Sequence, residues 1–162
     1  MIAITGTNGK TTSCYLISQM LNNLGIKCGY IGTIGFYINE KIKDLNNTTP
    51  DILDIYEMLL ECKKNGCEYV ALEASSHALS KDRLKGLLFD YAVFTNLTEE
   101  HLDYHKTMDN YANAKSRIIY QLEDILLFTE RNALTNKSPQ IRYFAWHFAV
   151  NNLIPDNFIP TF

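Results

Sequence analysis

The chain has 162 residues, 46% of them hydrophobic, which suits one compact domain with a buried core. A formal net charge of −3 argues against a nucleic-acid module, because such modules usually carry a clear excess of lysine and arginine. The sequence shows neither the basic segment and apolar run of a signal peptide nor an apolar stretch of the roughly 18 residues that span a bilayer. We therefore expect a cytoplasmic domain whose partners are small molecules, with no nucleic acid and no membrane among them.

The cysteines are Cys14, Cys28, Cys62 and Cys67, and no two of them form a Cys-x-x-Cys pair. This spacing fits neither a zinc knuckle nor a disulfide framework. We expect free, reduced thiols.

The N-terminal segment predicts a strand followed by a helix. Residues 1–4 form a short apolar run, and apolar residues then recur with helical spacing over residues 11–24. The residues with this spacing are Leu16, Ile17, Met20, Leu21 and Leu24. Gly25 follows as a natural end for the helix.

The next segment predicts a strand, a turn and a second helix. Residues 30–38 are strand material, and the turn near residues 39–40 would make a small hairpin. Residues 50–51, Pro-Asp, open the helix and Gly66 ends it. Its predicted apolar face consists of Ile52, Ile55, Tyr56 and Leu59.

Two short continuous apolar runs, Tyr69–Leu72 and Tyr91–Phe94, predict strands buried on both faces, as in a parallel sheet covered by helices. A further helix is expected over residues 108–122. Its apolar side would consist of Tyr111, Ala114, Ile118 and Leu122. The pattern predicts an α/β fold with a mostly parallel sheet flanked by helices. From about residue 129 the periodicity is lost, and we leave residues 129–162 unassigned.

The strongest functional signal follows the first predicted strand and opens the first predicted helix. It consists of Gly6, Thr7, Asn8, Gly9, Lys10, Thr11 and Thr12. In a phosphate loop, glycines let backbone N–H groups point at phosphate oxygens, Lys10 would supply a cation for the β and γ phosphates, and the Thr11 hydroxyl can reach Mg²⁺. The general pattern has glycine five residues before Gly9, where this chain has Ile4. The alternative is a glycine-rich turn beside a solvated lysine.

Polar residues also follow the strand at residues 69–72, where Glu73 begins the segment Glu-Ala-Ser-Ser-His. Open α/β sheets bind ligands at the carboxyl ends of their strands, so Glu73 could hold a metal ion on the phosphates. The alternative is a partly buried carboxylate that accepts hydrogen bonds from local N–H groups.

A third polar segment, residues 95–105, follows the strand at residues 91–94 and contains His101 and His105. Histidines four residues apart suggest zinc, but the metalloprotease motif needs glutamate directly after the first histidine, and Leu102 stands there. Oxygen ligands near phosphates favour Mg²⁺ instead. For His105 we expect a hydrogen-bonded structural imidazole. Lys115, on the predicted helix that follows, would by the same physical reasoning be a solvated lysine.

The order and spacing of these segments resemble the central ATP-binding domain of Mur ligases. The resemblance is carried by residues 6–12, 48–50 (Thr-Thr-Pro), 73–77 and 94–105, and it covers roughly residues 2–122. Within that family the chain is most similar to the tripeptide synthetase, or MurE, type. Those enzymes add an amino acid to UDP-N-acetylmuramoyl-L-alanyl-D-glutamate in peptidoglycan synthesis.

The resemblance implies a role for individual residues. The loop at residues 6–12, together with Asn96, would bind ATP, and Thr11, Glu73 and His101 would hold Mg²⁺. Lys115 would be carbamylated and, as an anion, help to place a second metal ion. The implied catalytic residues are Lys10, His101 and Lys115.

The resemblance also implies a substrate site, formed by Thr48, Thr49, Ser75 and Arg83, for the UDP-muropeptide. Lys81 stands where relatives often have glutamine. In the implied reaction a substrate carboxylate attacks the γ-phosphate, and an incoming amine converts the acyl phosphate to an amide. Mg²⁺ and Lys10 would offset the repulsion between carboxylate and phosphate.

The chain is shorter than the family's enzymes, which carry further domains for the UDP moiety and the incoming amino acid. We therefore expect a partial central domain at residues 1–128 of a truncated chain. The alternatives are a non-catalytic or degenerate nucleotide-binding fragment, and another synthetase of the superfamily, of the folylpolyglutamate or cyanophycin type. The sequence identifies neither the incoming amino acid nor the oligomeric state.

Overall fold

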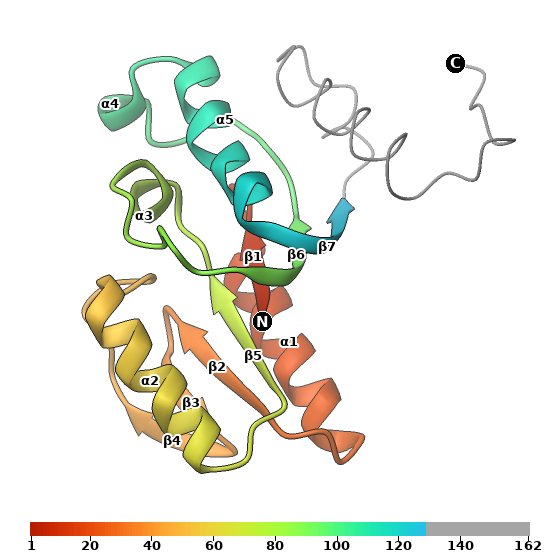
Figure 1. Cartoon of the computed structure of the whole chain (residues 1–162). Coiled ribbons are helices and arrows are strands. Elements are labelled where there is room, and N and C mark those ends of the chain that lie inside the picture. The colour runs from red at the N-terminus through yellow and green to blue at the C-terminus, as the bar shows by residue number, and fades with distance from the viewer. Residues whose placement is uncertain (129–162) are drawn as a thin grey trace, which may run out of the picture.

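The computed structural model describes residues 1–128, which form a seven-stranded sheet flanked by helices (Figure 1). In chain order the elements are β1 (Ile2–Thr5), α1 (Lys10–Asn23), β2 (Cys28–Gly32), β3 (Gly35–Ile38), β4 (Glu40–Lys43), α2 (Ile52–Lys64), β5 (Tyr69–Glu73), α3 (Ser76–Ser80), β6 (Phe89–Phe94), α4 (Leu102–His105), α5 (Met108–Ser116), the 3₁₀ helix η1 (Arg117–Gln121) and β7 (Leu122–Phe128). The strand order is β4-β3-β2-β5-β1-β6-β7. Strands β2, β5, β1, β6 and β7 run parallel to one another, and β3 pairs antiparallel with both β2 and β4. The predicted α/β fold with a mostly parallel sheet is confirmed.

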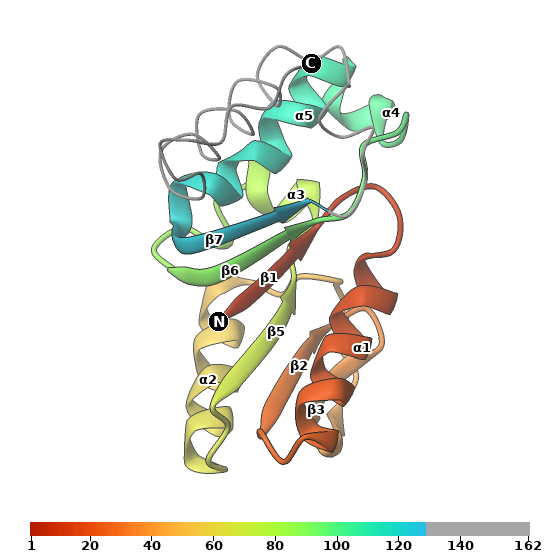
Figure 2. The ribbon, with the colours of Figure 1, turned by 90° about the vertical axis from the view of Figure 1, so that its right-hand side faces the viewer.

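The central strands of the sheet are buried on both faces because helices cover each side. Side chains alternate along β1, so Ala3 packs in one core cluster while Ile2 and Ile4 pack in another. Figure 2 shows α1 and α2 on opposite sides of the sheet. This arrangement explains the continuous apolar strands, since a strand covered on both faces has no solvent side for polar residues.

Helix α1 has the predicted extent, but its buried face differs from the predicted one. Leu16, Met20 and Leu24 are exposed, whereas Cys14 and Ser18 are buried against the sheet. Ile17 and Leu21 are partly buried and pack against the core, as predicted. The small side chains of Cys14 and Ser18 allow the helix to approach the sheet closely. Helical spacing indicated a helix correctly without showing which stripe faces the core.

Residues 30–38, predicted as strand material, do not form one continuous strand. The structure has two antiparallel strands, β2 and β3, in which Gly32 pairs with Gly35 across a tight turn. Gly35 has φ of +126°, and a Cβ at this position would overlap the Lys43 carbonyl oxygen. Glycine therefore permits the turn that the apolar run concealed. The second turn, at Asn39 with φ of +62°, is the predicted one and leads into β4.

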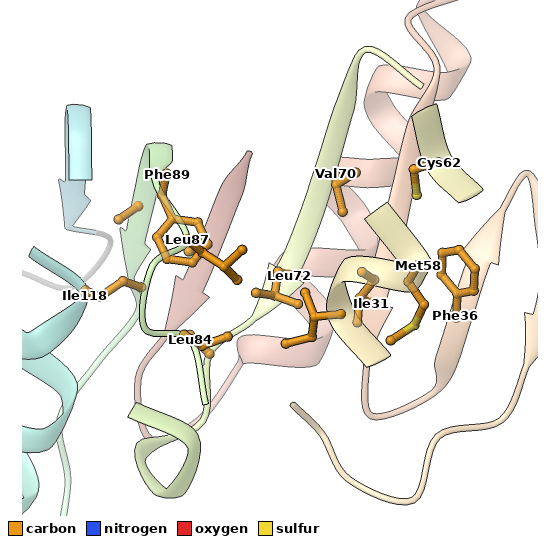
Figure 3. Packing of buried hydrophobic residues seen from close by; sticks show 14 of the residues in the cluster. Ile31, Phe36, Met58, Cys62, Val70, Leu72, Leu84, Leu87, Phe89 and Ile118 are labelled. Atoms are coloured by element: carbon orange, nitrogen blue, oxygen red, sulfur yellow. The ribbon is translucent and has the colours of Figure 1, made fainter. Parts of the chain in front are cut away.

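Helix α2 packs its face of Ile55, Met58 and Cys62 into the larger core cluster, beside Ile31 and Phe36 (Figure 3). The predicted face was partly wrong. Ile55 is buried as expected, but Tyr56 is 45% exposed. The core face is therefore rotated toward residues 58 and 62.

The predicted helix at residues 108–122 is α5 followed by η1, and Leu122 already belongs to β7. Tyr111, Ala114 and Ile118 are buried, as predicted. The unassigned segment from residue 129 onward lies outside the described residues, so its separation from the domain at residue 128 stays a prediction. No helix within residues 1–128 is long and apolar enough to cross a membrane.

Candidate functional site

Three polar segments meet at one edge of the sheet because β1 lies between β5 and β6 and all three strands are parallel. Ile4 pairs with Glu73 on one side, and Thr5 pairs with Phe94 on the other. The loop after β1, the segment after β5 and the segment after β6 therefore leave the sheet together. This is the carboxyl edge, where open α/β sheets bind ligands.

The loop between β1 and α1 has the backbone that its glycines permit. Gly6 has φ of +142° and lies so close to the β6 segment that a Cβ would overlap the Thr95 hydroxyl. Gly9 has φ of +80° and forms the N-cap of α1. Both conformations favour glycine, and the loop ends at a helix N-terminus, whose free N–H groups attract anions. The predicted strand, loop and helix are all present.

The segment after β6 clamps this loop through hydrogen bonds. The Asn8 N–H donates to Asn96 Oδ1 (2.9 Å), and Asn96 Nδ2 donates to the Asn8 carbonyl (3.0 Å). The Thr95 hydroxyl donates to the same carbonyl (2.7 Å). Thr7 Oγ1 accepts from the Thr98 N–H (3.0 Å). Asn96, predicted as a nucleotide-binding residue, thus lies beside the loop, and its side-chain amide holds the loop by hydrogen bonds to the backbone of Asn8.

Lys10 and Lys115 both donate hydrogen bonds to the carbonyl oxygen of Gly6. The Nζ–O distance is 3.0 Å for Lys10 and 2.6 Å for Lys115, and Lys10 also donates to the Thr7 carbonyl (2.6 Å). Burial lowers the pKa of Lys10, while Glu100 and Glu73 act in the opposite direction.

Thr12, also predicted to bind ATP, is exposed in the first turn of α1.

Lys115 is buried, so the expectation of a solvated lysine is wrong. Its side chain is 1% exposed and lies over the ring of Tyr111, with Nζ 4.6 Å from the ring centroid. Burial, and next the charge of Lys10, lower the pKa of Lys115 well below its usual value. An amine in this position reaches its neutral, nucleophilic form at a lower pH than a surface lysine does.

Glu73 is fully buried at the end of β5, and its carboxylate accepts four hydrogen bonds. Thr11 Oγ1 and Thr33 Oγ1 donate to Oε2 at 2.8 and 3.2 Å. The Thr33 N–H (3.0 Å) and the Tyr30 hydroxyl donate to Oε1. The donors come from α1, β2 and the turn after β2, and not from local N–H groups. Thr11 and Glu73, each predicted to bind Mg²⁺, are therefore in direct hydrogen-bond contact, and their role as metal ligands stays a prediction.

His101 lies at the edge of the site in a left-handed backbone conformation, with φ of +56°. Its ring centroid is 4.9 Å from that of His77, and its Nε2 is 3.6 Å from Glu100 Oε2. That oxygen of Glu100 is shielded from solvent and has no hydrogen-bond partner within the described residues. A bound cation or donor could satisfy it.

His105 is buried, and its Nε2 lies 3.1 Å from Ser76 Oγ. Burial lowers its pKa first, and His77 and Lys115 lower it further. These contacts agree with a structural imidazole.

The residues predicted to bind substrate lie together around the end of β5. Thr49 Oγ1 donates to the Glu73 carbonyl (2.6 Å) and accepts from the Ser75 N–H (3.0 Å). Arg83 donates to the Thr49 carbonyl (3.2 Å) and pairs with Asp51 at 3.0 Å. The hydroxyl of Thr48, the remaining predicted substrate residue, lies 3.1 Å from the Thr33 hydroxyl.

A pocket of about 320 Å³ joins the two predicted groups. It is lined by Lys10, Asn47, Thr48, Thr49, Ser75, Ser76, His77, Lys81, Arg83, His101 and Lys115. The predicted catalytic residues therefore share one cavity with the predicted substrate residues. Thr11 and Glu73 contact each other but do not line the pocket, whereas His101 and Lys115 do. The four predicted metal ligands therefore form two separate pairs. Within residues 1–128, no three His, Cys, Asp or Glu side chains converge as a metal site.

Sequence reasoning missed several residues of this edge. They are Tyr30, Thr33, Thr95, Glu100 and Tyr111. Thr95 and Glu100 lie within a polar segment that the sequence singled out, but Tyr30 lies in an apolar run and carries no comparable signal.

Comparison with known proteins gives a consistent family. The family model described as "Mur ligase middle domain" matches residues 4–154. A UDP-N-acetylmuramoyl-L-alanyl-D-glutamate–2,6-diaminopimelate ligase of Fusobacterium nucleatum is 46% identical over 125 residues, which are 77% of this chain and 25% of the relative. The ligase of the same name from Clostridium perfringens is 47% identical over 118 residues, or 73% of this chain and 24% of the relative.

A solved structure of a ligase with the same name matches with a TM-score of 0.70 and 34% identity. The match covers 85% of this chain and 30% of that one. The chain thus spans about a quarter of the length of the curated relatives that it matches.

Proposed function

We propose that this chain, which belongs to the Mur ligase family by the match of residues 4–154 to the family's middle domain, is the ATP-binding core of a peptidoglycan ligase. The proposed enzyme is an ATP-dependent acid–amino-acid ligase acting on UDP-N-acetylmuramoyl-L-alanyl-D-glutamate in the cytoplasm. The names of its relatives support 2,6-diaminopimelate as the incoming amino acid. The same names argue against a synthetase of the folylpolyglutamate or cyanophycin type.

One observation carries the proposal: a single pocket brings Lys10 of the phosphate loop and Lys115 of α5 to the residues proposed to bind substrate. Lys10 and Lys115 line it together with Thr49 and Arg83. A ligase that forms an acyl phosphate must hold a carboxylate against the γ-phosphate. Two anions can approach each other only where cations offset their repulsion.

The proposed chemistry assigns a task to each part of the site. The loop N–H groups and Lys10 bind the phosphates, and Arg83 with the threonine hydroxyls orients the substrate. The substrate carboxylate attacks the γ-phosphorus, ADP leaves, and the incoming amine then displaces phosphate from the acyl phosphate to form the amide. The protein aligns these groups and stabilises charge, without a nucleophilic side chain.

Mg²⁺ fits the residues present. The Thr11 hydroxyl and the buried Glu73 carboxylate are hard oxygen donors 2.8 Å apart at the start of α1. We assign them to one cation, which would neutralise phosphate charge. We assign His101 and a carbamylated Lys115 to a second cation within the pocket. The lowered pKa of Lys115 supports carbamylation, because only the neutral amine reacts with carbon dioxide.

Calorimetric titration with a non-hydrolysable ATP analogue and Mg²⁺ tests the proposal. We expect the wild-type chain to bind and the Lys10→Ala variant to lose measurable affinity, because Lys10 is the cation within the loop. Lys64→Ala, which removes an exposed lysine from the end of α2, is the matched control and should bind as the wild type does.

The other outcomes are equally clear. Equal binding by wild type and Lys10→Ala would show that the phosphate site is placed wrongly. Absence of binding in every variant would favour the alternative of a non-catalytic, degenerate fragment.

A further inference from the structure

A buried tyrosine touches the carboxylate that we assign to Mg²⁺. The Tyr30 hydroxyl donates a hydrogen bond to Glu73 Oε1, and the side chains of Tyr30 and Glu73 are 1% and 0% exposed. The residues come from neighbouring parallel strands, β2 and β5. A buried carboxylate with a missing donor is costly, so this contact is one that the site depends on.

The surrounding residues hold the phenol ring in place. Tyr15 and Tyr37 pack edge-on against Tyr30, with ring centroids 5.7 and 5.8 Å away. A Cβ at Gly32 would overlap both the Tyr30 hydroxyl and Glu73 Oε1. The backbone at Gly32 therefore leaves the space in which the hydroxyl and the carboxylate meet.

The two oxygens of Glu73 have donors of different kinds. Oε1 accepts from the fixed Thr33 N–H and from the Tyr30 hydroxyl, whose ring is packed on its edges. Among the residues that the structure describes, Oε2 accepts only from the hydroxyls of Thr11 and Thr33, which can rotate. A cation that binds Oε2 needs only hydroxyl rotation there, whereas the donors on Oε1 stay in place. Thr11 Oγ1 can then turn its lone pair to the same cation.

The contact with Glu73 depends on the hydroxyl of Tyr30 and not on its ring. Phenylalanine would fill the same space in the core, but it has no hydroxyl to donate to Glu73.

We propose that Tyr30 is a positioning residue for cation binding: its hydroxyl fixes Oε1 of Glu73 so that Oε2 is presented to a Mg²⁺ ion shared with Thr11. This inference rests on the proposed magnesium and nucleotide site. Tyr30 acts through Glu73 and touches neither the cation nor the nucleotide. In metal sites, a hydrogen bond to a ligating carboxylate commonly changes metal affinity by about 10–100-fold.

The test compares Tyr30→Phe with Tyr37→Phe. Tyr30→Phe removes the hydroxyl that donates to Glu73 and keeps the aromatic ring. Tyr37→Phe removes a hydroxyl from the half-buried neighbour in the same aromatic cluster. Each chain is titrated with the ATP analogue with and without Mg²⁺, and with Mn²⁺ alone by electron paramagnetic resonance. Near-ultraviolet circular dichroism checks that the packing is retained.

We expect Tyr30→Phe to weaken Mn²⁺ binding by about 10–100-fold. The gain in nucleotide affinity that Mg²⁺ gives the wild type should fall by about the same factor in this variant. Nucleotide affinity without Mg²⁺ should be unchanged, and Tyr37→Phe should match the wild type throughout. A purely structural role for Tyr30 would instead reduce nucleotide affinity equally with and without Mg²⁺, and this would overturn the proposal.

Two further outcomes separate this inference from the proposed function. If the wild type binds Mn²⁺ but no nucleotide, the proposed function fails while the Mn²⁺ affinities still decide the role of Tyr30. If Tyr30→Phe binds Mn²⁺ as the wild type does, cation binding does not need the Tyr30 hydroxyl, and the inference is wrong. It is also wrong if the wild type binds no Mn²⁺, because there is then no cation for Tyr30 to position.

Discussion

At the scale of single residues, the main feature of the site is a pair of lysines on one carbonyl oxygen. Lys10 and Lys115 both donate to Gly6, and burial lowers the pKa of each. Two ammonium groups this close repel each other, as the effect of Lys10 on the pKa of Lys115 shows. Bound phosphate would relieve the repulsion, and so would conversion of Lys115 to an anionic carbamate.

The pH dependence of carbamylation follows from the lowered pKa of Lys115. Carbon dioxide reacts with the amine and not with the ammonium ion, so carbamate should increase as pH rises through that lowered pKa. It should reach a given level at a lower pH than on a surface lysine. We expect a carbamate signal in the ¹³C NMR spectrum of the chain in labelled bicarbonate, absent from Lys115→Ala and retained in Lys106→Ala. A signal that Lys115→Ala retains would assign the modification to another amine.

At the scale of elements, helix α2 shows how far periodicity goes. A helix was predicted between its opening at residues 50–51 and its end at Gly66, and α2 spans Ile52–Lys64. The buried stripe, however, includes Met58 and Cys62 and leaves Tyr56 exposed. The helix has apolar residues of its own on several sides, so its sequence pattern fits more than one buried face. The sheet selects the face whose side chains fill the space over Ile31 and Phe36.

The corrected face predicts a contrast between two residues of α2. Met58 is 1% exposed and Leu60 is 58% exposed. Met58→Ala should lower the free energy of unfolding by about 2–4 kcal/mol because it removes buried apolar surface and leaves a cavity. Leu60→Ala should change it by no more than about 0.5 kcal/mol. Urea unfolding measures both, and similar losses in the two variants would contradict the assigned face.

At the scale of the whole molecule, the sheet has a stable centre and a marginal edge. Strand β1 lies between β5 and β6, with all four of its residues buried, whereas all four residues of β4 at the sheet edge are exposed. The charged residues of β4 also suit an edge strand, because they discourage pairing with other chains. The functional loop leaves from β1, so the most secure strand anchors the phosphate site.

Native-state hydrogen exchange tests this gradient. Amides of β1 should exchange only through global unfolding, because opening them disrupts both neighbouring strands. Amides of β4 should exchange faster, through local opening of the β3–β4 hairpin. NMR exchange rates measured at several urea concentrations distinguish the two routes. Equal protection of β1 and β4 would mean that the sheet opens as a single unit.

The sequence by itself determined the α/β class, the phosphate loop and the polar segments after β5 and β6. These depend on local rules: buried parallel strands are continuously apolar, and a loop that cradles phosphate needs glycines and a lysine at fixed spacing. Glu73 and Lys10 were identified for this reason. The roles proposed for Lys115, His101 and Arg83 came from family resemblance, since their residue types alone indicate no partner.

Only the tertiary structure decided which of these residues meet. Strand order places β1 between β5 and β6, and this joins Lys10, Arg83 and Lys115 around one pocket although they lie far apart in the chain. It also places Tyr30 against Glu73, a contact between residues 43 positions apart. Apolar spacing describes one element at a time, whereas burial of a lysine or pairing of a tyrosine with a carboxylate depends on which elements pack together.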